Sequence, residues 1–358
     1  MVFDGEADPA LVEQLGGRVV YSYGIVPAVA ATAPGQVISQ LAAHPRVVRV
    51  EPDGEVHIDA TELDATELDA TWGVKRIGAG TVHAGGNKGA GVKVAVLDSG
   101  CDYTHVDLAL NFDGGYDFVG NDTDPMDDNG HGTHVSGTVV AEADGAGVVG
   151  VAPEASLYCL KVLNSNGSGA WSDIIAALDW AVDNGMDVTN NSYSSGTNPG
   201  GTVQAAFNAA AAAGILHVAA AGNTGNPRGK GNKVGYPARF ETVIAVGATD
   251  ASDERPSFSS TGDAVELAAP GVAVNSTVPM GGCELCDGSG YKTLDGTSMA
   301  SPHVAGTAAL VIAAGITDDN GDGNINDEVR LRLQQTADEL GDPGRDPHYG
   351  FGLVDADG

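Results

Sequence analysis

From Trp72 onward, short apolar runs alternate with longer segments that have the composition of helices. Nearly continuous runs of Val, Ile, Leu and Ala are typical of strands buried on both faces, as in parallel sheets covered by helices. We expect strands at 92–97, 156–162, 187–192, 215–220 and 243–246, and helices at 131–142, 172–183 and 202–213. The alternation predicts an α/β domain over 72–358, with a doubly wound parallel sheet and helices on both faces.

The first 58 residues contain smaller elements. Strands are expected at 18–23, 28–31 and 47–50 and a helix at 35–43, which together predict a compact α+β unit over 1–58. Two copies of one acidic pentapeptide, 61–65 and 66–70, follow this unit. Because these copies are charged and lack residues that favour turns, we interpret 59–71 as an exposed linker between two domains.

The balance of charge excludes several classes of function. The chain has 48 acidic against 17 basic side chains and a net charge of -31, so a nucleic-acid backbone or an anionic membrane would repel it. Such an excess of carboxylates needs counterions. We expect both an acidic surface of the halophilic kind and specific calcium binding.

No segment has the pattern of a membrane span. The most apolar stretch, 205–221, is interrupted by Asn208, Gly214 and His217, and we interpret it as a helix followed by a buried strand. The acidic first eight residues lack the apolar core of a secretion signal. We therefore expect a protein that either stays inside the cell or begins after a removed signal.

Three polar residues stand at the ends or beginnings of predicted elements. Asp98 directly follows the strand at 92–97, His131 opens a helix after Gly130, and Ser298 precedes an apolar helical run. Because ligands bind at the carboxyl ends of parallel strands, we expect these side chains at one edge of the sheet. A lone serine is more often a helix cap. A serine, a histidine and a carboxylate together supply the nucleophile, the base and the group that orients the base.

Long motifs surround all three residues. They are Val-Ala-Val-Leu-Asp-Ser-Gly at 94–100, Asn-Gly-His-Gly-Thr-His-Val-Ser-Gly-Thr at 129–138, and Gly-Thr-Ser-Met-Ala-Ser-Pro-His-Val-Ala-Gly at 296–306. With these motifs in the order Asp, His, Ser, which is subtilisin's own order, the chain from 72 to 356 resembles the subtilisin-like serine proteases. The resemblance implies a serine endopeptidase with Asp98, His131 and Ser298 as catalytic residues and Asn223 as a side-chain donor to the oxyanion.

The same resemblance implies a cleft that holds substrate as an extended strand. Its substrate-binding residues are expected to be Gly167, Ser168, Gly169, Trp171, Ser192, Tyr193, Ser194 and Gly235. Gly235 matches the floor of the primary specificity pocket, so a large apolar residue is expected before the cleaved bond. Ser194 stands where the family usually has glycine. Trp171 is either a wall of the cleft or a core aromatic residue of the following helix.

Calcium is the cofactor that the resemblance implies. The expected site combines the side chains of Asp107 and Asp144 with the carbonyls of Glu142, Ala146 and Val148.

Two further acidic segments are weaker candidates for calcium. The loop at 318–326 resembles the first nine positions of an EF-hand loop, with Asp318, Asn320 and Asp322 as ligands, but its twelfth position is Val329. It is either an irregular site or a turn. The aspartates within 122–128 form either a calcium site or a solvated surface.

The spacings of histidine and cysteine residues raise the alternatives of a zinc site and of disulfides. His131 and His134 have the spacing of a zinc pair, but no glutamate with general-base spacing accompanies them, and we interpret His134 as a packed structural residue. Four cysteines are too few for a disulfide-built fold. A local disulfide between Cys283 and Cys286 stays open, whereas Cys101 and Cys159 are expected to behave as small apolar residues beside buried strands.

The N-terminal unit resembles the propeptide of these proteases, which assists folding and then blocks the cleft as an intramolecular inhibitor. Its usual first strand is expected to be missing, because the chain starts at its first helix. We expect a secreted, monomeric, calcium-dependent zymogen that is processed between about 57 and 72. The alternatives are a protease-like module that holds peptides without cutting them, and a calcium-buffering surface protein.

Overall fold

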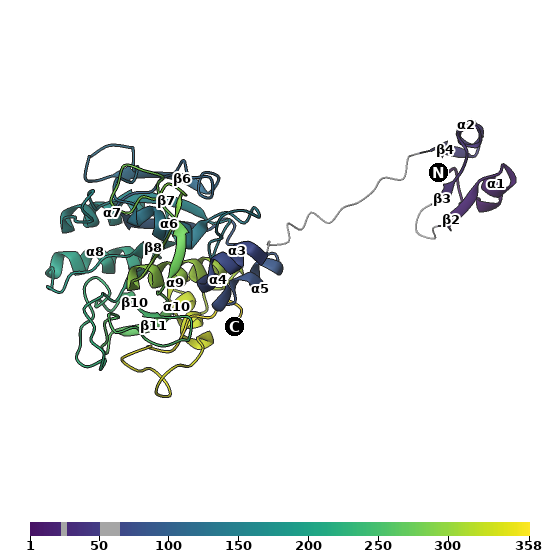
Figure 1. The fold of residues 1–358 in the computed structure, drawn as a ribbon. Helices are drawn as coiled ribbons and strands as arrows, with labels where there is room; N and C mark the ends of the chain where they lie inside the picture. The colour runs from purple at the N-terminus through teal and green to yellow at the C-terminus, as the bar shows by residue number, and fades with distance from the viewer. Residues whose placement is uncertain (23–26, 51–64) are drawn as a thin grey trace. The chain divides into compact units, whose positions relative to one another are not determined.

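The computed structural model describes residues 1–22, 27–50 and 65–358 of the chain (Figure 1). Its residues divide into two compact units, Met1–Ala60 and Thr61–Gly358. None of the helices within the described ranges has the length and apolar character needed to cross a bilayer.

The smaller unit has the element order βαββαβ. In sequence these elements are β1 (Val2–Phe3), α1 (Pro9–Gln14), β2 (Arg18–Ser22), β3 (Val29–Thr32), α2 (Gly35–Ala42) and β4 (Val47–Arg49). β1 pairs with β4, β2 pairs with β3, and an isolated bridge from Val2 to Ala28 lies beside β3. Apolar side chains from both helices and from the strands form a separate small core.

One expectation about this unit is wrong. A first strand is present, since Phe3 of β1 is buried and the two residues of β1 pair antiparallel with β4. Two apolar residues beside acidic ones are too short to show the alternation by which strands are recognised. Pairing with the distant β4, rather than local propensity, makes this segment a strand.

The larger unit is built on a seven-stranded sheet in the order β11-β10-β9-β8-β5-β7-β6, in which every neighbouring pair is parallel. In chain order the strands are β5 (Lys93–Asp98), β6 (Phe112–Asp117), β7 (Ser156–Lys161), β8 (Val188–Asn191), β9 (Leu216–Ala220), β10 (Val243–Thr249) and β11 (Val265–Pro270). The prediction of a parallel α/β sheet is therefore confirmed. A hairpin of β12 (Val274–Thr277) and β13 (Tyr291–Leu294) lies outside this sheet.

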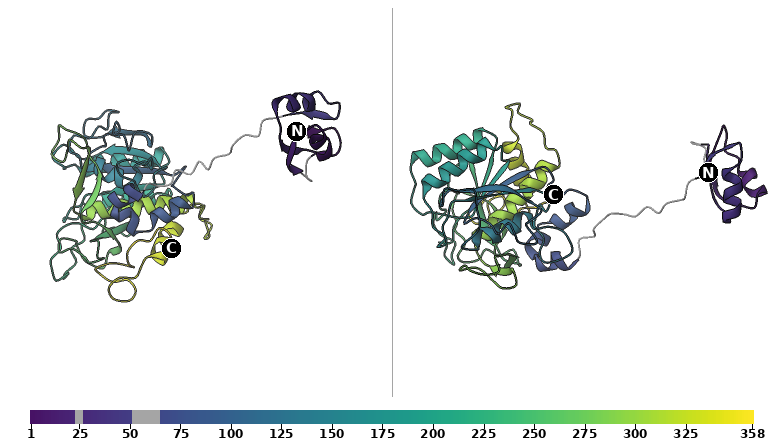
Figure 2. Two further views of the ribbon diagram at one scale, coloured as in Figure 1. Left: turned by 45° about the vertical axis from the view of Figure 1, so that its right-hand side comes forward. Right: turned by 90° about the horizontal axis from the view of Figure 1, so that it is seen from above.

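Helices cover both faces of the sheet (Figure 2). Their bounds are α3 (Ala65–Ala70), α4 (Trp72–Arg76), α5 (Ala79–Ala84), α6 (His131–Val140), α7 (Trp171–Asp183), α8 (Gly201–Ala212), α9 (Thr297–Ala313) and α10 (Asn326–Thr336). Because successive strand residues point to opposite faces, Val94 and Val96 of β5 join the core beneath α6 and α9. Ala95 and Leu97 join the core beneath α7 and α8.

Two strands of the sheet lack the apolar pattern by which the others were predicted. β6 has the sequence Phe-Asp-Gly-Gly-Tyr-Asp, and β11 carries a fully buried glutamate, Glu266. The carboxylate of Glu266 accepts hydrogen bonds from the guanidinium of Arg330 and from the amide of Gln334 on α10. A buried charge is tolerated in this strand because distant partners satisfy it.

The interpretation of 59–71 as an exposed linker is wrong for its last part. Ala65–Ala70 forms α3, and Glu67 on this helix is only 1% exposed. Its Oε1 accepts backbone hydrogen bonds from Asp144, Gly145 and Ala146 in the larger unit. The second pentapeptide therefore packs against the sheet domain, whereas the first copy lies almost entirely outside the described residues.

Candidate active site

Asp98 is the last residue of β5, in the middle of the parallel sheet, and its side chain is fully buried. Its Oδ1 accepts a hydrogen bond from the backbone N–H of Ser99 at 2.7 Å and lies 2.8 Å from Nδ1 of His131. Because a carboxylate can only accept, Nδ1 carries the proton and Nε2 is left with a free lone pair. This pair is the arrangement required of a base and its orienting group.

His131 reaches Asp98 because α6 begins very close to β5. A Cβ at Gly132 would lie 2.0 Å from the carbonyl oxygen of Gly100 and 3.1 Å from Cβ of Asp98, so only glycine permits this approach. The His131 side chain remains 22% exposed at the surface. Burial disfavours the charged imidazole, but the charge and hydrogen bond of Asp98 outweigh it, and the net pKa of His131 is raised.

Ser298 is the second residue of α9 and is half-buried. Ser298 Oγ donates to the carbonyl of Ser192 at 3.0 Å, and Ser192 Oγ donates to the carbonyl of Ser298 at 2.8 Å. One turn later, Ser301 Oγ donates to Oδ1 of Asn190 in β8 at 2.7 Å. The start of α9 is thereby fixed to the end of β8, the neighbour of β5. Among the described residues, no hydrogen bond joins Ser298 Oγ to His131.

Asn223 lies three residues beyond β9 and is exposed. Its Oδ1 accepts hydrogen bonds from the backbone N–H and the hydroxyl of Thr297, at 3.0 and 2.9 Å. This use of Oδ1 leaves the Asn223 amide N–H groups available beside the first turn of α9, where the Ser298 N–H also has no intrahelical partner. The structure thus brings Asn223 to the N-terminus of the helix that carries Ser298.

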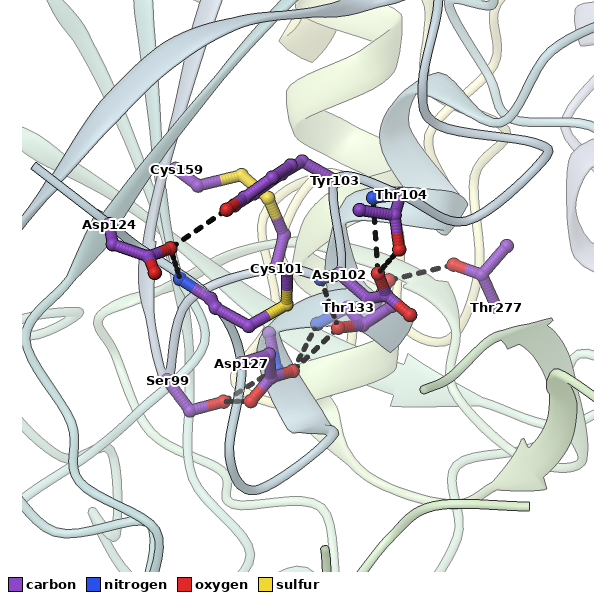
Figure 3. Close-up of a disulfide and its surroundings, with 12 residues drawn as sticks. Ser99, Cys101, Asp102, Tyr103, Thr104, Asp124, Asp127, Thr133, Cys159 and Thr277 are labelled. Atoms are coloured by element: carbon purple, nitrogen blue, oxygen red, sulfur yellow. Dashed lines mark hydrogen bonds between the residues drawn. A yellow bond between two sulfur atoms is a disulfide. The ribbon is translucent and has the colours of Figure 1, made fainter. Parts of the chain in front are cut away.

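Asp127, which the sequence analysis considered only as one of the aspartates within 122–128, organises the turn before His131. Both of its oxygens accept hydrogen bonds. One accepts from the Ser99 hydroxyl and the other from the hydroxyl and backbone N–H of Thr133 (Figure 3). The backbone N–H groups of Asn129 and Gly130 donate to Asp127 as well. The other aspartates of 122–128 are exposed: Asp124 accepts a hydrogen bond from Tyr103, Asp128 pairs with Lys161, and Asp122 accepts the N–H of Asp124. The cluster therefore combines one buried carboxylate held by the protein with three carboxylates at the solvated surface.

Figure 3 also shows that the expectation for Cys101 and Cys159 is wrong. These residues form a disulfide with a Cα–Cα distance of 6.0 Å, linking the segment after Asp98 to β7. Both are fully buried, which is why burial alone suggested a small apolar role. Cys283 and Cys286 form a second, local disulfide. His134 is packed as predicted, with Nε2 near the carbonyls of Val274 and Lys292 and a pKa lowered by burial to about 3.

The residues expected in the cleft differ in exposure. Gly167, Ser168 and Gly169 are exposed, while Tyr193 follows the buried Ser192 at the end of β8. The rings of Trp171 and Tyr193 pack edge to face, with centroids 6.3 Å apart. Trp171 is half-buried and packs against Tyr193 and the core beneath α7.

Ser194 lies against the buried Gly235. A Cβ at Gly235 would be 3.0 Å from Cβ of Ser194 and 3.1 Å from the carbonyl oxygen of Ser195. The backbones of Ser195 and Tyr236 are hydrogen-bonded to each other in both directions. A side chain at Gly235 would therefore press on the segment that carries Ser194.

Comparison with known proteins identifies the family. Residues 89–352 match the subtilase family, and residues 6–59 match the family named peptidase inhibitor I9. The chain belongs to the subtilase family. It is 42% identical to subtilisin E of Bacillus subtilis over 345 residues, which cover 96% of this chain and 83% of that protein. It is 46% identical to subtilisin DY of Bacillus licheniformis over 286 residues, covering 80% of this chain and 97% of the relative. An alkaline protease of Alkalihalobacillus alcalophilus is 40% identical over 345 residues, covering 96% and 82%.

This subtilase is therefore a serine endopeptidase, made as a zymogen with an inhibitory propeptide at its N-terminus. The resemblance seen in the sequence, the α/β fold and the class of enzyme are all confirmed.

The residues expected to bind calcium gather around the loop 142–148 of the subtilase. Asp107 Oδ2 accepts the Val148 N–H at 3.1 Å, and Asp144 Oδ1 accepts the Ala146 N–H at 3.0 Å. Glu142 Oε1 accepts the N–H of Leu110, so its side chain is engaged elsewhere. In the described part of the chain, no group of three or more His, Cys, Asp or Glu side chains converges as a metal site by itself.

Glu67 is the residue of this region that the sequence analysis missed. Its Oε1 is bound by the Asp144 loop, but its Oε2 is buried and has no hydrogen-bond partner among the described residues. Burial raises the pKa of Glu67, and the charge of Asp144 adds to that effect, although backbone hydrogen bonds oppose it. Burial likewise raises the pKa values of Asp107 and Glu142.

The EF-hand-like loop is ordered by its own carboxylates. Asp318 accepts the N–H groups of Gly321 and Gly323, and Asp322 accepts that of Asn324. Glu328, one position early for an EF-hand, folds back so that its Oε1 accepts the N–H groups of Asp319 and Asn320. Its Oε2 is buried and has no partner in the part of the chain that is described.

Proposed function

We propose that Ser298, His131 and Asp98 hydrolyse peptide bonds as a catalytic triad. Ser298 Oγ attacks the carbonyl carbon of the substrate, and Nε2 of His131 takes the hydroxyl proton and later delivers it to the leaving amine. A water molecule activated by the same nitrogen then releases the acyl group from Ser298. Asp98 holds the proton on Nδ1 and stabilises the imidazolium that forms.

The observation that carries this proposal is the 2.8 Å contact between Asp98 and His131 at the edge where α9 presents Ser298. The bond from Ser298 Oγ to Ser192 is compatible with it, because a serine hydroxyl rotates between rotamers and catalytic hydrogen bonds tighten when substrate binds. Rotation of the Ser298 side chain would free Oγ for His131.

The proposed oxyanion donors are the amide of Asn223 and the backbone N–H of Ser298. Thr297 holds Oδ1 of Asn223, which orients the amide nitrogen, and the helix N-terminus supplies a partial positive charge. Loss of one such donor typically lowers turnover about 10² to 10³-fold.

Ser298→Ala tests the assignment. We expect kcat on a chromogenic peptide to fall about 10⁶-fold, because the nucleophile is lost. A serine-directed phosphonate should label the parent chain at Ser298 and leave Ser298→Ala unlabelled. A parent chain that binds peptides but neither cuts them nor reacts with the phosphonate would instead be the silent peptide-binding module.

We also propose that the cleft binds extended peptides at 167–169 and 192–194 and prefers a large apolar residue before the cleaved bond. The exposed glycines at 167 and 169 allow a peptide backbone to approach closely. Gly235 adds no side chain to the pocket floor, but Ser194 lies against it. Comparing kcat/KM for peptides with Phe, Leu, Ala or Glu at that position tests the preference, and a ranking led by Ala or Glu would reject it.

The proposed processing site lies before α3. Glu67 holds α3 against the loop 142–148 within the larger unit. Cleavage between 57 and 65 would therefore release the propeptide without unpacking α3. N-terminal sequencing of the mature enzyme locates the cut, and Ser298→Ala should stay full-length if processing is autocatalytic.

We further propose that the enzyme acts as a monomer outside the cell, in a salty medium. Two disulfides are typical of an oxidising compartment, and a net charge of -31 suits high salt. Casein hydrolysis compared between low and multimolar salt tests the halophilic part of this proposal.

Calcium is proposed at the Asp107 and Asp144 region, with Glu67 added to the expected ligands. The buried, unpartnered Oε2 of Glu67 beside two more carboxylates is the environment that a hard cation stabilises. The Glu142, Ala146 and Val148 carbonyls complete the proposed set. Calcium there would hold α3 against the loop and would take no part in peptide hydrolysis.

A second, weaker calcium site is proposed at Asp318, Asn320 and Asp322. The unpartnered Oε2 of Glu328 supports it, since Glu328 replaces the glutamate that an EF-hand has one position later. Calorimetric titration of the calcium-free Ser298→Ala chain should give one binding event fewer in Asp318→Asn/Asp322→Asn.

A further inference from the structure

The Cys283–Cys286 disulfide lies in the loop between β12 and β13, and this loop touches the turn that precedes His131. The backbone N–H of Leu285 donates to the carbonyl of Asn129 at 2.9 Å. A Cβ at Gly130 would lie 3.0 Å from Cβ of Leu285 and 3.2 Å from Sγ of Cys283. The disulfide loop therefore packs directly on the residue before the proposed base.

Gly130 is held from two sides. Its N–H donates to the buried carboxylate of Asp127 at 2.9 Å, while Leu285 and Cys283 cover the position where a side chain would stand. Gly130 has φ of 100°, a left-handed conformation that glycine adopts without strain and that a residue with a side chain rarely adopts. His131 follows as the first helical residue, so the position of its ring depends on this turn.

Much of the loop is exposed. The exposed residues are Met280, Gly281, Gly282, Glu284, Asp287, Gly288 and Ser289. Backbone hydrogen bonds from Asp287 to Pro279 and from Gly290 to Asp287 close the base of the loop, and between them the disulfide links Cys283 to Cys286. Its glycines would give it many conformations if the disulfide were absent. Leu285 lies between the two cysteines, whose Cα atoms are 5.1 Å apart, so the disulfide fixes the turn that presents Leu285 to Asn129 and Gly130.

We infer that Leu285, fixed by the Cys283–Cys286 disulfide, is a positioning residue for His131, and that full turnover requires this disulfide to be oxidised. The inference rests on the proposed role of His131 as the base. A dithiol would reduce the disulfide by transferring two electrons and two protons. The S–S bond breaks, Cys283 and Cys286 become thiols, and the dithiol becomes a cyclic disulfide.

The second disulfide provides an internal control. Cys101 and Cys159 are fully buried, whereas Cys283 and Cys286 are only half-buried, so a mild dithiol reaches the loop first. Mass spectrometry after thiol alkylation would identify which pair has been reduced.

The experiment compares the mature parent enzyme with Cys283→Ala/Cys286→Ala, with Leu285→Pro, which removes the N–H that donates to Asn129, and with the exposed loop variant Glu284→Gln. With phosphonate titration to count active sites, we expect kcat on a short peptide to fall about tenfold in the first two, because a misplaced base slows proton transfer. KM should stay within about twofold. Weaker contact with Asp98 should lower the pKa of His131, moving the acid limb of the kcat/KM profile to lower pH. Glu284→Gln should match the parent.

Dithiothreitol should lower kcat of the parent to that of the double variant and leave the double variant unchanged, and reoxidation should restore the parent. Unchanged kcat and pH profile in the double variant and in Leu285→Pro would overturn the inference. So would a loss of activity that tracks only the fraction of unfolded protein. His131→Ala separates the two claims, because an active His131→Ala enzyme defeats the proposed triad, whereas an inactive one beside a fully active double variant defeats only the positioning role.

Discussion

Two turns of the larger unit are each organised by one buried carboxylate, but the two carboxylates differ in their hydrogen-bond partners and in the charges around them. Asp127 caps the turn 127–133 before His131, and Glu67 caps the loop 142–148. Each accepts three backbone N–H groups, and burial raises the pKa of each. Asp127 has partners for both oxygens, whereas Oε2 of Glu67 has none in the described ranges.

The neighbours of the two carboxylates differ as well. Around Asp127 lie hydroxyls and the imidazole of His131, whose pKa the Asp127 charge helps to raise. Around Glu67 lie Asp144 and, close by, Asp107 and Glu142, all of one sign. The chain itself therefore completes the turn before His131, while the loop 142–148 keeps one buried carboxylate oxygen without a partner in the described ranges, and this oxygen is the basis of the proposed calcium site. Substitutions at the first should affect chemistry and at the second stability.

The largest contrast is expected between Asp98→Asn and Asp107→Asn. Asp98→Asn should lower kcat by about 10⁴, because the amide favours the wrong tautomer of His131. Asp107→Asn should leave kcat within about twofold when assayed in saturating calcium at 25 °C. Steady-state kinetics on a short peptide, with active sites counted by phosphonate, measures both. A comparable loss in both variants would show that the loop 142–148 acts on the chemistry.

Removal of calcium should affect stability through the loop 142–148. A ligand present at about 100 times its Kd stabilises the native state by about 3 kcal/mol, so chelation should lower Tm of the Ser298→Ala chain by several degrees. The inactive background prevents autolysis during heating. Asp107→Asn in that background should already have the lower Tm and respond little to the chelator. An equal response in Asp107→Asn and its parent would place the dominant cation elsewhere.

The residues of the candidate active site could be located from sequence because their signals are local. Asp98, His131 and Ser298 each follow a strand or open a helix within a long motif, and Asn223 follows β9. Buried apolar strands such as β5 and β9 can likewise be predicted from their sequence pattern. By contrast, β6 and β11 carry polar residues whose partners are far away in the chain, as Arg330 is for Glu266.

The residues that were missed depend on contacts between distant segments. Glu67 belongs to a repeated pentapeptide, and its local sequence does not distinguish it from the copy five residues earlier. Its burial follows only from packing against 144–146. The same holds for β1, which needs β4, and for the Cys101–Cys159 disulfide, which spans 58 residues. Cysteine spacing alone does not determine connectivity.

The pH dependence of kcat/KM offers a smaller test of the contrast between Asp127 and the carboxylates of the loop 142–148. Since Asp98 and Asp127 raise the pKa of His131, and only neutral imidazole can act as base, the acid limb of kcat/KM should lie above the ordinary histidine value of 6.5. Asp127→Asn removes one negative charge and should move this limb to lower pH. Asp107→Asn should leave the limb in place. Rate profiles from pH 5 to 9 measure the shift, and an upward shift in Asp127→Asn would contradict the assigned electrostatics.

The smallest effects are expected on α3, where Glu67 and Asp69 form a matched pair. Asp69 pairs with Lys75 at the surface, with side chains 64% and 61% exposed, so Asp69→Asn should change the free energy of unfolding by less than about 1 kcal/mol with or without calcium.

The effect of Glu67→Gln on the free energy of unfolding should have opposite signs with and without calcium. An acid whose folded pKa is raised destabilises the native state above that pKa and is relieved as pH falls through it. Without calcium at pH 8, Glu67→Gln should therefore stabilise the Ser298→Ala chain by roughly 1 kcal/mol, while with calcium it should destabilise it. Urea unfolding in chelator and in calcium measures both signs, and destabilisation of similar size in both solutions would mean that Glu67 is only a hydrogen-bonding cap.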